Sequence, residues 1–244
     1  MSITVKHVNQ LQKNNNKAIF LGCGKSINDL TDAQIEKINS QFDVWTSNCF
    51  MIHKKIIPDF YHLEVKPHRN GPIVTRITRQ KREEYKDVKW GLDMTRPYLI
   101  NYVGLDNFSL ENIYCYPKAY RSESTGKYKP DENILSVSLN ASLTLICDQI
   151  IKMGYEEIYF LGVDMYDREY FWTNNPEYDD VEIEDIIYTC KGEEKRPDLL
   201  HPTHKMKNFI NEIFEYNNQK AYNLSNRSLL KDTMKTLSLQ EVLG

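Results

Sequence analysis

The sequence predicts an α/β fold, a single Rossmann-like domain over residues 1–244 whose mostly parallel sheet is flanked by helices. A short apolar run at residues 17–22 leads into a glycine turn and an amphipathic segment. Apolar residues recur at helical spacing over residues 138–153, Gly154 ends that segment, and residues 155–164 form a second apolar run. Strand–turn–helix and helix–strand are the two halves of a βαβ unit, which builds parallel sheets. A chain of 244 residues, 41% of them hydrophobic, can bury the core of one such domain.

Apolar runs with polar ends predict the elements of the first half of the chain. A capped amphipathic helix is expected over residues 31–38, followed by strands over residues 42–48 and 56–65. A helix is expected over residues 75–85, because Pro67, Gly71 and Pro72 break the chain just before it. Both strands end in small or polar residues.

The second half alternates between strand-like, loop-like and helical segments. Polar stretches rich in Ser, Gly and Pro predict loops, and an acidic irregular stretch predicts an inserted lid. In chain order, we expect strands over residues 96–103 and 112–116, a loop over 117–133, a lid or loop insertion over 172–200, a helix over 204–218 and a last strand over 220–225.

Charge and composition exclude several classes of protein. The net charge of −3 gives no general attraction to nucleic acid. The sequence also has no apolar run of 18 residues, the length that could span a membrane. Five scattered cysteines form no C-x-x-C pair, so neither a zinc site nor a disulfide framework is expected. The N-terminus lacks the apolar core of a signal peptide, and a cytoplasmic location is expected. Basic residues 69–82 fit either a solvated helix face, which we favour, or contact with an acidic acceptor or a membrane surface.

The turn "GCGKS" at residues 22–26 follows the first strand, where backbone N–H groups could approach a phosphate. It matches neither the P-loop, which needs four residues between its glycines, nor the G-x-G-x-x-G dinucleotide pattern. From the residues alone, a nucleotide site and an ordinary strand–helix connection both stay open.

Polar residues end four of the predicted strands, at residues 22–26, 47–48, 62–64 and 164–166. Ligands of open parallel sheets bind outside the carboxyl ends of the strands, where the strand order reverses. These clusters are therefore expected to meet in one crevice.

Two tyrosines and two histidines near this edge could take part in chemistry. Tyr166 and Tyr170 could stabilise the negative charge that grows on a departing phosphate. His204 begins a helix, where the helix dipole favours the neutral imidazole that a general base needs. His201 and His204 lack a third ligand nearby, so no metal is expected.

In this order, the motifs resemble those of the bacterial sialyltransferases of glycosyltransferase family 42. The resemblance covers about residues 17–65 and 136–230 and leaves residues 66–135 unmatched. The matching stretches are "GCGKS" (22–26), "FDVWTSN" (42–48), "NAS" (140–142), "GYEEIYFLGVDMY" (154–166), Tyr170, "HPTH" (201–204) and "NRSLL" (226–230).

The resemblance implies a CMP-activated sugar as donor, a glycan as acceptor, no metal or other cofactor, and a lid. Cys23 replaces an asparagine of the family's first turn, and Tyr170 follows Tyr166 two residues sooner than in the family, so another nonulosonic acid or nucleotide sugar fits as well. The implied roles are binding of the donor substrate by Gly22, Cys23, Gly24, Asn48, His62, Ser142, Asp164 and His201, phosphate contact by Tyr166 and Tyr170, and proton removal from the acceptor by His204.

Two other functions remain open at this point. The strand "GYEEIYFLGVD" also resembles archaeal pterin pyrophosphokinases, which would need ATP and Mg²⁺ held by carboxylates such as Asp164 and Glu64. A non-catalytic nucleotide- or glycan-binding module is the third reading. For the transferase, we expect a bacterial enzyme of surface-polysaccharide synthesis, at the inner face of the membrane or free of it; the family also admits a homo-oligomer.

Overall fold

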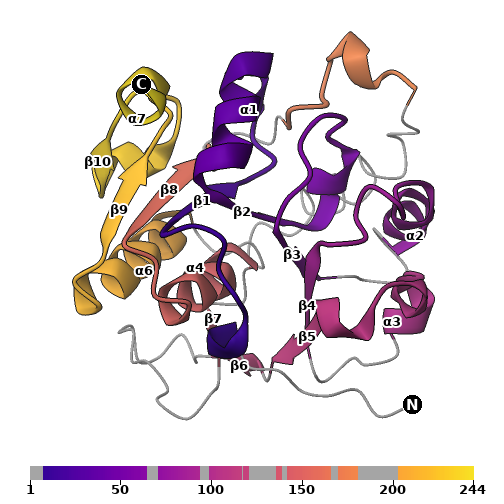
Figure 1. The fold of residues 1–244 in the computed structure, drawn as a ribbon. Coiled ribbons are helices and arrows are strands. Elements are labelled where there is room, and N and C mark those ends of the chain that lie inside the picture. The colour runs from indigo at the N-terminus through magenta and orange to yellow at the C-terminus, as the bar shows by residue number, and fades with distance from the viewer. Residues whose placement is uncertain are drawn as a thin grey trace.

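The computed structural model describes residues 8–64, 71–93, 99–116, 118–120, 136–138, 142–165, 170–180 and 203–244. Within them, eight parallel strands form one sheet in the order β10-β9-β8-β1-β2-β3-β4-β5 (Figure 1). A separate parallel pair joins β6 to β7. The strands are β1 (Lys17–Leu21), β2 (Asp43–Ser47), β3 (Phe60–Leu63), β4 (Lys89–Asp93), β5 (Ile113–Tyr116), β6 (Lys118–Tyr120), β7 (Ser136–Ser138), β8 (Glu157–Leu161), β9 (Lys220–Asn223) and β10 (Lys235–Thr236).

The strand order reverses at β1. From β1, the chain first adds β2 to β5 on one side and later adds β8 to β10 on the other. This doubly wound arrangement confirms the predicted α/β class with a parallel sheet, and its switch point lies between β1 and β8.

Helices cover both faces of the sheet (Figure 1). One hydrophobic cluster contains Ile38, Val74 and Leu243, and the cluster on the other face contains Ile146 and Ile210. The first face is covered by α1 (Asp32–Gln41), α2 (Gly71–Gln80), α3 (Leu99–Tyr102) and α7 (Leu239–Leu243), and the second by α4 (Ser142–Lys152) and α6 (Thr203–Tyr216).

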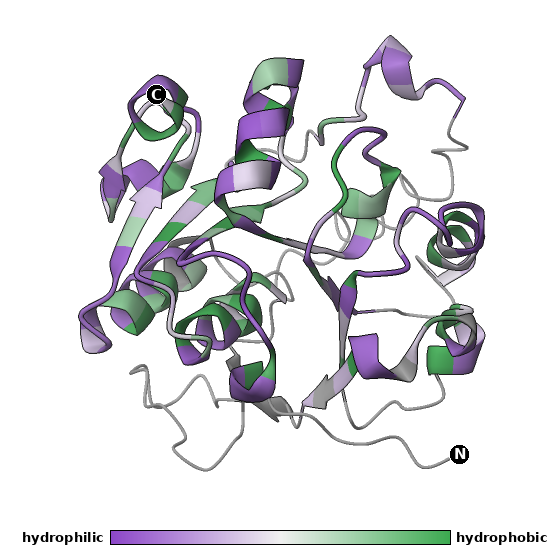
Figure 2. Cartoon of the chain, in the orientation of Figure 1, coloured by the Kyte–Doolittle hydropathy of each residue, from purple (hydrophilic) through white to green (hydrophobic). Residues whose placement is uncertain are grey.

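Local sequence accounts for the helix boundaries. The Thr31 hydroxyl accepts from the backbone N–H of Gln34, whose side chain accepts from the Thr31 backbone, so a complete capping box begins α1. The C-terminal end of α4 is followed by Gly154, whose positive φ of 71° is typical of the residue that ends a helix. Figure 2 shows hydrophobic and hydrophilic residues side by side on α1, α4 and α6, as expected for helices with one buried face.

Several predicted boundaries were wrong. Residues 99–102, expected in a strand, form α3, and residue 138, expected in a helix, belongs to β7. The helix expected over residues 75–85 begins instead at Gly71 and ends at Gln80; proline is tolerated in the first turn of a helix, so Pro72 does not break it. The strand at residues 220–223 is followed by β10 and α7, and β4 had not been predicted. Of the expected lid, residues 172–180 are described, and residues 181–200 lie outside the described residues.

At the switch point, the turns that follow β1 and β8 are joined by backbone hydrogen bonds. The N–H of Gly22 donates to the carbonyl of Leu161 at 2.8 Å, and the N–H of Gly24 donates to the carbonyl of Gly162 at 2.7 Å. A Cβ on Gly162 would lie 2.4 Å from the Gly22 carbonyl oxygen, and φ there is 73°. Glycine is therefore required at this position for space and for backbone conformation.

Replacing Gly162 tests this constraint, with Gly154 as a matched control. Gly154 also has a positive φ of 71°, but a Cβ there would meet no atom of the described residues within 4 Å. We expect Gly154→Ala to cost about 1–2 kcal/mol, the price of a left-handed conformation. Gly162→Ala should cost at least about 2 kcal/mol more, because the new methyl overlaps backbone atoms. Urea denaturation measures both, and equal losses would contradict the packing argument.

Candidate functional site

Four strand ends lie next to one another at the carboxyl edge of the sheet. The order β8-β1-β2-β3 brings together the polar residues that follow these strands. With strands about 4.8 Å apart, they span about 14 Å of the edge, enough for a nucleotide. The edge includes the switch point, where doubly wound sheets bind ligands.

Asp164 holds the glycine turn through hydrogen bonds to Ser26. Its carboxylate accepts from the Ser26 hydroxyl at 2.6 Å and from the Ser26 backbone N–H at 3.0 Å. The same hydroxyl accepts from the N–H of Gly162 at 3.1 Å. Asp164 is only 3% exposed, and a Cβ on Gly24 would lie 2.5 Å from its Oδ2. In this structure, Asp164 fixes the turn that the sequence suggested for nucleotide binding.

Tyr170 lies beside the same turn. Its backbone forms an antiparallel bridge with Gly24, and the next N–H, of Phe171, donates to the carbonyl of half-buried Cys23 at 3.0 Å. The Tyr170 ring stacks on Trp172 with centroids 4.6 Å apart and planes 8° apart. The structure thus places Tyr170 next to Cys23 and Gly24.

Asn48, Glu64 and Ser142 form a closed ring of hydrogen bonds that we call the polar triangle. The Glu64 backbone N–H donates to Asn48 Oδ1 at 3.0 Å, and Asn48 Nδ2 donates to Ser142 Oγ at 3.2 Å. The Ser142 hydroxyl donates to Glu64 Oε2 at 2.5 Å. The three residues come from the ends of β2 and β3 and from the first turn of α4, and all are partly exposed.

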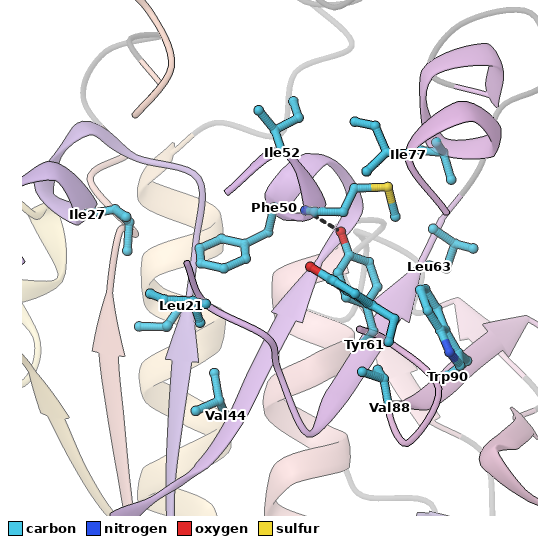
Figure 3. Close-up of a cluster of buried hydrophobic side chains, with 14 of the residues drawn as sticks. Leu21, Ile27, Val44, Phe50, Ile52, Tyr61, Leu63, Ile77, Val88 and Trp90 are labelled. Atoms are coloured by element: carbon cyan, nitrogen blue, oxygen red, sulfur yellow. Dashed lines mark hydrogen bonds between the residues drawn. The ribbon is translucent and has the colours of Figure 1, made fainter. Parts of the chain in front are cut away.

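The Asn48 turn has an unusual backbone that Tyr61 supports. Asn48 has a φ of 53° and begins the 3-10 turn η3 (Asn48–Ile52). The Tyr61 hydroxyl donates to the Asn48 carbonyl. It also accepts from the Met51 N–H at 3.0 Å, the bond dashed in Figure 3. Burial raises the pKa of Tyr61 well above its usual value, so the phenol keeps the proton that it donates.

His53 holds the far end of η3. Its Nδ1 accepts from the backbone N–H groups of Lys55 and Ile56, at 3.2 and 3.1 Å. The ring stacks on Phe50, with centroids 5.4 Å apart. Burial, with help from nearby Lys81 and Lys55, lowers the pKa of His53 to about 4, and the neutral ring can accept both bonds.

His62 is buried on the opposite face of the sheet from Tyr61. It is 1% exposed, and the Tyr116 hydroxyl lies 3.0 Å from its Nδ1 and 3.1 Å from its Nε2. Its backbone lies at the candidate edge, next to the end of β2. The structure therefore gives His62 a packing partner close to the polar triangle.

Both helices of the second face begin at the carboxyl edge, because α4 leads into β8 and α6 into β9 through short turns. Ser142 opens α4, and the backbone of His204 lies at the second position of α6. Helix N-termini attract anions through their unpaired N–H groups. Tyr166 and His201 lie outside the described residues.

Glu64, like Asp164, is a polar residue of this edge whose partner the sequence did not predict. Its bond to Ser142 joins positions 78 residues apart, and no spacing in the sequence signals it.

In the described parts of the chain, no group of three or more His, Cys, Asp or Glu could hold a metal ion. No described helix is long and apolar enough to cross a membrane.

A polar hollow of about 410 Å³ lies next to the glycine turn, whose Lys25 lines it. Lys25, Asn28 and His53 line it, together with residues 173–178. Residues 173–178 continue from Tyr170, so the described part of the expected lid borders both the turn and this hollow.

The sequence matches no protein-family model and no curated protein. Its fold is similar to solved sialyltransferases. The monofunctional alpha-2,3-sialyltransferase Cst-I of Campylobacter jejuni is 13% identical, with a TM-score of 0.51 over 92% of this chain and 81% of that one. Sialyltransferase CST-II bound to a trisaccharide acceptor and CMP is 16% identical, with a TM-score of 0.52 over 90% and 85%.

A complex of the Campylobacter jejuni enzyme CstII with the substrate analogue CMP-3FNeuAc gives similar values, 15% identity and a TM-score of 0.51 over 90% and 85% of the two chains. At such low identities, these similarities establish a shared fold. They agree with the fold that the motif resemblance implied.

Two buried tyrosines allow a matched test of the Asn48 turn. Tyr61→Phe leaves the Met51 N–H and the Asn48 carbonyl without their partner and should cost about 1–3 kcal/mol. Tyr85 packs in the same cluster with its ring centroid 6.3 Å away, and its buried hydroxyl has no hydrogen-bond partner among the described residues. Tyr85→Phe should therefore be neutral or slightly stabilising. Chemical denaturation decides, and equal effects would refute the supporting role of Tyr61.

Proposed function

We propose that the protein is a glycosyltransferase that transfers sialic acid or a related nonulosonic acid from a CMP-activated donor to a glycan hydroxyl. The main support is the carboxyl edge, where the glycine turn, the polar triangle and the openings of α4 and α6 lie at the switch point. The shared fold with sialyltransferases solved with CMP adds weight. The motif resemblance assigns Gly22, Gly24, Asn48 and Ser142 to the nucleotide.

In the proposed reaction, the acceptor hydroxyl oxygen attacks the anomeric carbon of the donor sugar. The bond from that carbon to the phosphate oxygen breaks, and CMP leaves with the electron pair. His204 takes the proton of the acceptor hydroxyl, and Tyr166 and Tyr170 donate hydrogen bonds to the departing phosphate. Tyr170 beside Gly24 suits this role, since it lies where the phosphate would meet the turn.

The arrangement of carboxylates also supports a transferase over a pyrophosphokinase. The alternative needs Asp164 and Glu64 as Mg²⁺ ligands. Asp164 instead accepts two hydrogen bonds from Ser26, and Glu64 accepts one from Ser142. Asp164, which is only 3% exposed, thus already serves the protein scaffold.

Nucleotide binding tests the proposal directly. CMP should raise the melting temperature without Mg²⁺, while ATP with Mg²⁺ should have no effect. A ligand at 100 times its Kd stabilises the folded state by about 2.7 kcal/mol. Thermal-shift measurements with CMP, CDP, UDP, GDP and ATP, each with and without Mg²⁺, make the comparison. A shift only with ATP and Mg²⁺ would favour the pyrophosphokinase.

His204 provides the test of catalysis. His204→Phe should lower turnover by about 10²- to 10⁴-fold, the usual contribution of a general base, and should leave the CMP-induced thermal shift in place. Asn208→Ala, an exposed change in the same helix, is the control and should keep full turnover. Assays use a CMP-nonulosonate donor with a glycan acceptor. Near-normal turnover by His204→Phe would remove His204 from the mechanism.

A further inference from the structure

The chemistry of the polar triangle fixes where each of its hydrogen atoms points. The Glu64 backbone N–H can only donate, so the side-chain oxygen of Asn48 must face it. The Asn48 amide nitrogen therefore faces Ser142 and donates to its hydroxyl oxygen. Ser142 has one hydroxyl hydrogen, and its short 2.5 Å bond to Glu64 uses it, as expected for a hydroxyl bound to a carboxylate.

These directions determine which hydrogen-bond donors and acceptors of the triangle could contact a ligand. An asparagine amide has two N–H hydrogens, and the bond to Ser142 uses one of them. A carboxylate accepts at about four lone-pair positions and never donates, so Glu64 can serve Ser142 and still accept from a ligand. The triangle thus presents a strong acceptor, the Glu64 carboxylate, close to one donor, the second N–H of Asn48.

The position of the triangle makes this pair reachable. All three residues are partly exposed, and they lie at the carboxyl edge where the proposed nucleotide would bind. The N-terminus of the 11-residue helix α4 stabilises the negative charge of Glu64. A phosphate would be repelled by that charge, whereas a neutral group that donates a hydrogen bond would be attracted.

The base of CMP has the matching pattern. Cytosine presents an amino group, which donates, next to ring nitrogen N3, which accepts. Uracil presents the reverse, a carbonyl oxygen next to an N–H. Pairing of a Glu or Asp carboxylate with the cytosine amino group recurs in base recognition. Uracil would place its carbonyl oxygen against the Glu64 carboxylate.

We infer that Glu64 is a specificity-determining residue that selects cytosine over uracil, accepting a hydrogen bond from the cytosine amino group while Asn48 donates to N3. This inference rests on the proposed function, because it takes CMP as the nucleotide of the donor. It assigns Glu64 a role in binding, and the roles of His204 and the tyrosines do not depend on it.

The test compares Kd values for CMP and UMP by titration calorimetry in the wild type, Glu64→Gln and Glu83→Gln. The wild type should prefer CMP by about 5- to 150-fold, which corresponds to the 1–3 kcal/mol of one good base-reading pair. In Glu64→Gln, the preference should fall below about threefold, because a glutamine amide can donate to the uracil carbonyl as readily as it accepts from cytosine. Glu83 is exposed in the turn before β4, at the other edge of the sheet, and Glu83→Gln should keep the preference.

Two further readouts separate the outcomes. The melting temperature of Glu64→Gln reports whether the fold is retained, and the CMP:UMP ratio of the wild type is independent of any variant. If 2′-deoxy-CMP abolishes the effect of Glu64→Gln while the base preference persists, Glu64 holds the ribose and the inference is overturned. CMP binding without preference over UMP would overturn it too and leave the proposed function standing. Absence of CMP binding to the wild type would overturn both.

Discussion

The backbone of the turn after β1 lies directly against the backbone of the turn after β8 and is hydrogen-bonded to it. Gly22 and Gly24 donate to the carbonyls of Leu161 and Gly162, and Ser26 reaches across to Gly162 and to the buried Asp164. Side chains on these glycines would overlap atoms of the opposite turn. This contact sets the spacing of the two central strands at the switch point. Every other strand takes its position outward from this pair, so the candidate site depends on it.

The same contact changes the interpretation of the sequence motif. Small residues after a first strand suggest close approach of a phosphate, and sequence alone left this open. The structure supplies a packing reason for both glycines and a structural role for Asp164. A ligand could still bind above the turn, beside Tyr170. What the sequence could not reveal is that Ser26 and Asp164, 138 residues apart, are partners.

Elements with strong local signals were predicted from sequence, and elements defined by tertiary contacts were not. Residues 17–22 and 155–164 are apolar runs bounded by turns, and β1 and β8 lie within them. In contrast, β4 (Lys89–Asp93) has the sequence KWGLD, which has little strand character until Trp90 and Leu92 are buried against neighbouring elements. Residues 99–102 favoured a strand by composition, yet Ile100 packs into the core from a short helix. Packing outweighed propensity in both cases.

The polar triangle shows how one rigid unit can connect the two halves of the site. Asn48 tolerates its left-handed φ better than most residues, and Tyr61 holds its carbonyl, so the fold meets the cost of this conformation before any ligand arrives. Ser142, which closes the triangle, also opens α4, and α4 runs directly into β8, whose end positions Asp164 beneath the glycine turn. The group that would recognise the base and the turn that would meet the phosphate are therefore two ends of one helix–strand unit. Their separation is fixed by the fold, so a nucleotide could meet both without reordering the backbone, and its binding free energy would be available for orienting the sugar.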